Sequence, residues 1–80
     1  MSHTPHELHD EFPESVARIS RMKSQDAHFC RIADDYHALN RQIHRIEVQI
    51  EAASDFRMEE LRKKRLALKD EIAEMLRQKA

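Results

Sequence analysis

Histidine is the residue type in this sequence best suited to chemistry, because imidazole binds metals and titrates near neutral pH. Six of the 80 residues are histidines, and His3, His6 and His9 lie close together. Residues spaced by three rotate steadily around a helix, so these three are poorly placed to share one ion. His37 and His44 lie two turns apart, about 10 Å, which is also too far. We predict solvated histidines and no metal; zinc or nickel bound to native protein would favour a metal site.

A basic run, Arg62–Arg65 followed by Lys69, could bind phosphates. On a helix its side chains spread around most of the circumference, and Glu59–Glu60 and Asp70–Glu71 lie within reach for ion pairing. The net charge of −1, from 14 basic and 15 acidic residues, also argues against binding nucleic acid through bulk charge. We predict an ion-paired, solvated helix face. The alternative is a small nucleic-acid-associated protein that uses the run from Arg62 to Lys69.

The sequence offers little basis for catalysis. Cys30 has His28 and Arg31 nearby but no glycine-rich oxyanion loop, since the chain lacks glycine altogether. No Ser–His–Asp set, phosphate loop or pair of carboxylates in a cleft can be assembled on so small a surface. We therefore predict a protein that is not an enzyme and uses no cofactor.

Cysteine content and hydropathy indicate the compartment. A single cysteine cannot form an internal disulfide, which is typical of cytoplasmic proteins. No apolar run approaches the roughly 20 residues needed to span a bilayer. The first residues also lack the basic-then-apolar form of a signal peptide. We expect a cytoplasmic protein with no membrane partner.

Composition predicts an all-α fold, because helix-favouring residues dominate and tight turns with positive φ are costly without glycine. Two segments, at about 26–52 and 55–77, show heptad spacing, and Ser24 or Asp26 is positioned to cap the first. The first seam is apolar throughout: Phe29, Ile32, Tyr36, Leu39, Ile43, Ile46 and Ile50. The second contains one polar member, Arg65: Met58, Leu61, Arg65, Leu68, Ile72 and Met75.

A turn at about 53–55 is short enough to make these helices antiparallel neighbours. We predict a coiled-coil-like two-helix hairpin over residues 23–80, in which Ile50 lies opposite Leu61 and Ile46 opposite Arg65. Residues 1–22 are predicted to form a short, broken helical arm that folds over the open end of the hairpin.

Arg65 interrupts the second seam and has two interpretations. Its stem can pack while its guanidinium reaches Glu47 or Asp70. Alternatively, it fixes register or oligomeric state, as lone polar seam residues do elsewhere. Replacing Arg65 with Leu is expected to raise thermal stability under both interpretations, but only the second predicts a changed oligomer.

The hairpin seam is covered on one side only, which predicts self-association. Partial burial of side chains does not easily offset the conformational entropy lost on folding, which costs about 1.5 kcal/mol for each ordered residue. Val48, Leu66 and Leu76 also lie off the seam, where another chain could cover them. We predict a homo-oligomer, in its simplest form two hairpins in a four-helix bundle.

Three stretches cover most of the chain and resemble the YdcH-like family of small bacterial proteins of unknown function: HELHDEFPE from His6, DAHFCRIADDYHALNRQIHRIE from Asp26 and LRKKRLALKDEIAEML from Leu61. The SlyX-like family is a second resemblance, but it lacks the amino-terminal HELxxEFP-type stretch. The YdcH-like resemblance implies a bacterial, cytoplasmic helical hairpin that associates with itself or with a partner. It implies no catalytic or binding residues.

The same resemblance singles out polar positions that lie off the apolar seam. These are candidates for a partner-facing or intersubunit surface: His28, His37, His44, Arg45, Glu47, Lys69 and Asp70. The competing interpretation is an interhelical polar network in which they bond to one another. We expect a non-enzymatic oligomeric coiled-coil module that acts in protein–protein interaction or as a regulatory adaptor.

Overall fold

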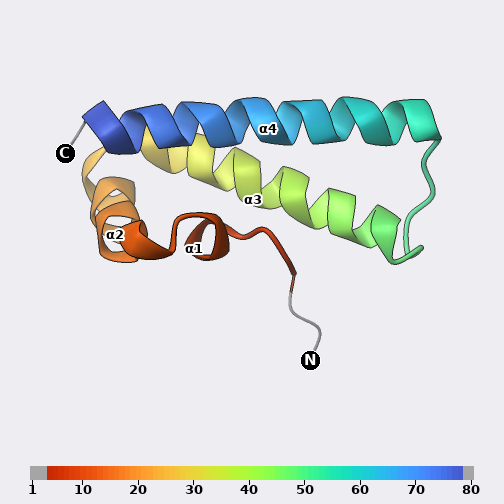
Figure 1. Ribbon diagram of the computed structural model, residues 1–80, viewed down its shortest axis with the longest axis horizontal. Helices are drawn as coiled ribbons and strands as arrows, with labels where there is room; N and C mark the ends of the chain where they lie inside the picture. The colour runs from red at the N-terminus through yellow and green to blue at the C-terminus, as the bar shows by residue number, and fades with distance from the viewer. Residues whose placement is uncertain (1–3, 79–80) are drawn as a thin grey trace.

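The computed structural model describes residues 4–78, which contain helices and no strand (Figure 1). The prediction of an all-α fold is confirmed. The elements in chain order are α1 (Leu8–Glu11), the 3-10 turn η1 (Pro13–Ser15), α2 (Val16–Gln25), α3 (Ala27–Glu47) and α4 (Asp55–Gln78).

The two long helices, α3 and α4, lie side by side and run in opposite directions (Figure 1). A side chain caps each of them at its start. The Asp26 carboxylate accepts a hydrogen bond from the Phe29 backbone N–H at 3.1 Å. Ser54 Oγ accepts one from the Arg57 backbone N–H at 3.0 Å. These caps satisfy amides that the first turn of a helix otherwise leaves without partners.

Helix α3 ends at Glu47, and the prediction that it continues to about residue 52 is wrong. Gln49 takes the left-handed conformation, with φ of 65°. Its backbone N–H donates to Ile46 O at 3.0 Å and that of Ile50 to Arg45 O at 2.9 Å. This is the Schellman arrangement, in which glycine is the usual residue at the left-handed position. Here glutamine closes the helix, so no glycine marks the end in the sequence.

The connection between the long helices therefore spans residues 48–54 rather than about 53–55. Ile50 lies in this loop and is 75% exposed, so the predicted pairing of Ile50 with Leu61 is wrong. Leu61 is buried all the same.

The segment before α3, here called the arm (residues 4–25), contains α1, η1 and α2 and runs three residues beyond the predicted boundary at residue 22. It packs beside α3 (Figure 1). Arm, α3 and α4 share one core of buried side chains: Leu8, Ile19, Met22, Phe29, Ile32, Ala33, Tyr36, Ile72 and Leu76. The sequence suggested that another chain could cover Leu76, but it is buried within this one. Arg18 of the arm also reaches α4, since its Nη1 donates to Leu76 O at 2.9 Å.

None of the helices within residues 4–78 is both long enough and apolar enough to cross a membrane.

Candidate interaction surfaces

A buried asparagine joins the arm to both long helices. Asn40 is 1% exposed. Its Nδ2 donates to Pro5 O at 2.8 Å, and its Oδ1 accepts from Arg65 Nη1 at 3.0 Å. Arg65 thus bonds to a neutral amide on α3, where the sequence suggested Glu47 or Asp70. Sequence reasoning missed Asn40; the only signal was a lone asparagine beside the apolar seam.

Two further residues of α3 hold the start of the arm. The Tyr36 hydroxyl donates to His6 O at 2.5 Å, and His37 Nδ1 lies 2.6 Å from Glu7 Oε2. His37 Nε2 lies 3.3 Å from Lys23 Nζ. His6 itself takes the left-handed conformation, as Gln49 does, with φ of 63°. His37, a predicted surface residue, therefore binds the arm.

Lys69 also binds the arm. Its Nζ donates to Glu11 Oε1 at 3.2 Å, and His6 Nδ1 lies 3.1 Å from the same oxygen. Burial acts to raise the pKa of the Glu11 carboxyl, but the hydrogen bonds from Lys69 and His6 outweigh it, so that the pKa is lowered. Glu11 is therefore a charged link between α1 and α4 at neutral pH.

The other predicted surface residues are spread along the helices. Glu47 pairs with Arg62 on α4 at 3.1 Å, and Arg45 pairs with Glu51 of the loop at 3.1 Å. Near the opposite end of α3, His28 Nε2 lies 3.5 Å from Glu71. Within residues 4–78 the side chains of His44 and Asp70 have no hydrogen bond or ion pair.

The seven predicted residues therefore do not form one patch. His28 and Glu47 lie 19 positions apart on α3, about 28 Å along the axis. His37 and Lys69 are committed to the arm. The pairs in which these residues take part join helix to helix, helix to loop and helix to arm.

The amino-terminal histidines show no metal-binding arrangement in the described part of the chain. His6 lies 3.1 Å from Glu11, and His9 lies 3.6 Å from Asp10. Among residues 4–78, no three or more His, Cys, Asp or Glu side chains are grouped to hold an ion. His3 lies outside the described residues.

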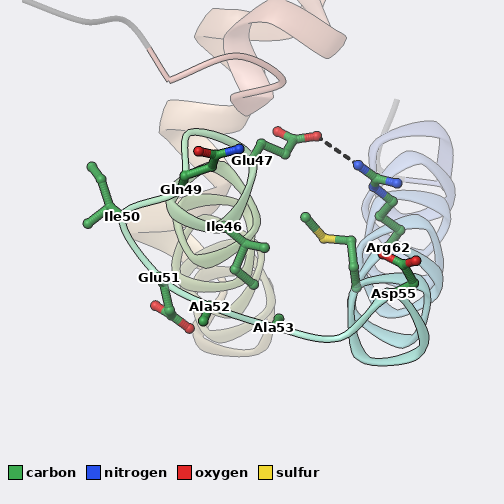
Figure 2. A pocket seen from close by; sticks show the side chains of 10 residues that line it. Ile46, Glu47, Gln49, Ile50, Glu51, Ala52, Ala53, Asp55 and Arg62 are labelled. Atoms are coloured by element: carbon green, nitrogen blue, oxygen red, sulfur yellow. Dashed lines mark hydrogen bonds and ion pairs between the residues drawn. The ribbon is translucent and has the colours of Figure 1, made fainter.

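A cavity of about 690 Å³ lies at the loop end of the molecule. Figure 2 shows Ile46 pointing between α3 and α4, with the Glu47–Arg62 pair bridging the two helices beside it. Ile50, which also lines the cavity, projects on the side of α3 away from α4 (Figure 2). Ile50 and Phe56 are 75% and 73% exposed, so this end carries two large apolar side chains without cover in the monomer.

A groove of about 660 Å³ runs between the long helices. It is lined by residues of α3 and α4 alone: Asp35, Ala38, Leu39, Gln42, Arg45, Lys64, Ala67 and Leu68. Asp35 lies two positions before His37, and Ala38 lies two positions before Asn40. Two positions correspond to roughly 200° around a helix, so these groove residues lie nearly opposite the residues that bind the arm. The groove therefore faces away from the arm.

The fold and these contacts define a small helical protein in which an arm is fastened by polar contacts across a pair of long helices. The chain belongs to the family described as "Protein of unknown function (DUF465)", whose model matches residues 29–76. The YdcH-like family belongs to it, so the resemblance seen in the sequence is confirmed. The match covers most of α3 and α4 and leaves out the arm. No curated protein and no solved structure matches the chain.

Proposed function

We propose that this protein is a non-enzymatic, self-associating helical module that acts by binding proteins, with α3 and α4 as a coiled-coil-like hairpin in the cytoplasm. One observation carries the proposal. The groove that faces away from the arm has an apolar centre and opposite charges at the two ends of its α3 side. A second copy of this chain is the occupant that fits this pattern.

The centre of the groove favours close helix packing. Leu39 and Leu68 are half-buried, so a second copy would complete their burial. Ala38 and Ala67 beside them are small and let another helix approach closely. Covering this surface gains roughly 25 cal/mol per Å² of apolar area removed from water.

The charges favour a twofold arrangement. Asp35 and Arg45 are ten positions apart, about 15 Å along α3. A twofold axis across the middle of α3 places Asp35 of one copy beside Arg45 of the other, twice over. Arg45 is now paired with Glu51, but an exposed pair contributes only about 0–1 kcal/mol and can be exchanged. The product is a four-helix bundle with both arms outside.

Charge reversal tests this arrangement directly. Asp35→Arg alone sets two arginines against each other, and Arg45→Glu alone sets two carboxylates against each other. Each variant is expected to sediment as a monomer at concentrations where the wild type is a dimer. Mixing the two variants restores both opposite-charge pairs, so the mixture is expected to form a heterodimer.

Glu51→Gln is the matched control, because it removes the charge that now pairs with Arg45 and leaves the charges of Asp35 and Arg45 in place. It is expected to leave the dimer intact or to strengthen it. A wild type that stays monomeric at about 100 μM, far above a micromolar Kd, overturns the proposal. So does a mixture of the two variants that remains monomeric.

The alternative, nucleic-acid binding by the run from Arg62 to Lys69, has less support. Three of its basic residues already have carboxylate partners: Arg62 with Glu47, Lys63 with Glu59 and Lys69 with Glu11. An extended phosphate backbone would have to displace these pairs. Salt-dependent retention of the protein on DNA or RNA would favour the alternative.

A further inference from the structure

We propose that a small cavity between the arm and α4 binds a tetrahedral oxyanion, and that its ligand is a phosphate group. The cavity has a volume of about 160 Å³. Six of its lining residues are polar or charged: His6, Glu11, Tyr36, Arg62, Arg65 and Lys69. They come from the arm, from α3 and from α4, so folding alone brings them together.

The small size of the cavity favours a small ligand. Pockets for drug-sized molecules occupy roughly 300–1,000 Å³, well above the 160 Å³ found here. A phosphate group, with five heavy atoms, is small enough to enter the cavity.

The residues that line the cavity carry more positive than negative charge, which favours an anionic ligand. Arg62, Arg65 and Lys69 supply three permanent positive charges to its wall, against one carboxylate, Glu11. Glu47, outside the cavity, pairs with Arg62, and Glu11 pairs with Lys69. The charge of Arg65 is then left without a counterion among the described residues that line the cavity.

The Arg65 guanidinium has a fixed position and hydrogen-bond donors available for such a ligand. A guanidinium carries five N–H donors, and within residues 4–78 the Arg65 side chain makes one hydrogen bond, to the neutral amide of Asn40. That bond fixes the position of the planar group. Guanidinium groups match phosphate oxygens geometrically and can donate to two of them at once.

Helix geometry separates this site from the rest of the basic run. Arg62, Arg65 and Lys69 follow at spacings of three and four and share one face of α4. Lys63 is directed elsewhere and pairs with Glu59 at 3.3 Å. The site therefore takes a single phosphate group and provides no track for a polymer. This inference does not depend on self-association.

Binding is tested by adding inorganic phosphate, and separately O-phosphoserine, to ¹⁵N-labelled protein at ionic strength held constant with chloride. We expect saturable shifts centred on His6, Glu11, Tyr36 and Arg65. Saturation by both compounds identifies a monoester or free phosphate as the ligand class. Saturation by inorganic phosphate alone identifies the free ion. Either result supports the site.

Three variants test the roles of the side chains. Arg65→Gln keeps a donor for Asn40 but removes the charge, and it is expected to weaken phosphate binding about tenfold or more. Lys63→Gln makes the same change of charge outside the cavity and is expected to leave the affinity unchanged. Glu11→Gln removes the competing carboxylate and is expected to tighten binding several-fold.

The absence of any saturable shift with either compound overturns the proposal. Equal losses of affinity in Arg65→Gln and Lys63→Gln overturn it as well, because they indicate only diffuse attraction by charge. If Arg65→Gln fails to fold, the location of the shifts in wild-type protein decides the matter: shifts centred on Lys63 and Lys64 contradict the site.

Discussion

Arg65 Nη1 donates to Asn40 Oδ1 at 3.0 Å across the interface between α3 and α4. The same amide donates to Pro5 O at 2.8 Å, so three segments of the chain meet at one buried side chain. Removing the Arg65 guanidinium would leave this buried amide oxygen without its donor. The partner of Arg65 is thus a buried neutral amide and not the surface carboxylate that one interpretation predicted.

Arg65→Leu is expected to destabilise the protein by about 1–3 kcal/mol, because it leaves Asn40 Oδ1 buried without a donor. This reverses the expectation drawn from the sequence, in which a leucine simply completes an apolar seam. Urea denaturation measures the change. The double variant Asn40→Leu/Arg65→Leu is expected to recover part of the loss. An Arg65→Leu variant more stable than wild type would contradict this prediction.

Tyr36, the single tyrosine, is expected to ionise only at higher pH than an exposed tyrosine. Burial raises its pKa from 10.0 to about 12, with Glu11 adding to the effect. Since the unfolded chain releases this proton more readily, the stability linked to it is complete below pH 10 and is lost as pH rises toward 12. Ultraviolet titration of the phenol measures the pKa. Tyr36→Phe, which also loses the bond to His6 O, supplies the control; ordinary titration near pH 10 would contradict the burial.

Protonation of Glu11 in acid is expected to lower the stability of the protein. Its pKa lies below the usual 4.5 because the bonds from Lys69 and His6 outweigh burial. A lowered pKa in the folded state gives stability that is complete above 4.5 and is lost as pH falls further. Denaturation at a series of pH values should therefore show a weaker acid dependence in Glu11→Gln. Glu14→Gln makes the same change at an exposed carboxylate of η1, and an equal effect there would contradict the prediction.

Ile43 and Ile50 form a matched pair on the predicted seam. Ile43 is 0% exposed and Ile50 is 75% exposed. Ile43→Val should cost about 0.5–1.5 kcal/mol, whereas Ile50→Val should change stability by less than about 0.5 kcal/mol. Thermal or urea denaturation of the two variants checks the difference. Equal losses of stability in the two variants would indicate that Ile50 is buried in solution, as the heptad spacing predicts.

Heptad spacing located most of the α3 core, since Phe29, Ile32, Tyr36 and Ile43 are all buried. It worked because a side chain's position around a helix follows directly from its number. The heptad spacing failed at Ile50. There the helix ends at a left-handed Gln49, and the glycine that usually indicates such an end in a sequence is absent.

The polar contacts were harder to predict than the core. Asn40 lies next to the seam, and nothing local indicates that it is buried; its partners are 25 positions later and 35 earlier in the chain. For the predicted surface residues, the sequence identified groups able to bond but not their partners. Partner choice for His37 and Lys69 depends on where the arm lies, and periodicity carries no information about that.

The start of the arm is held through the carbonyl oxygens of Pro5 and His6, which accept from Asn40 and Tyr36. Every amino acid has a backbone carbonyl, so these contacts impose no requirement on the side chains of the arm. Both donors lie within residues 29–76, which the family model matches. Substitutions of the arm side chains would therefore leave both carbonyl acceptors in place, whereas substitutions of Tyr36 or Asn40 would remove the donors on which the position of the arm depends.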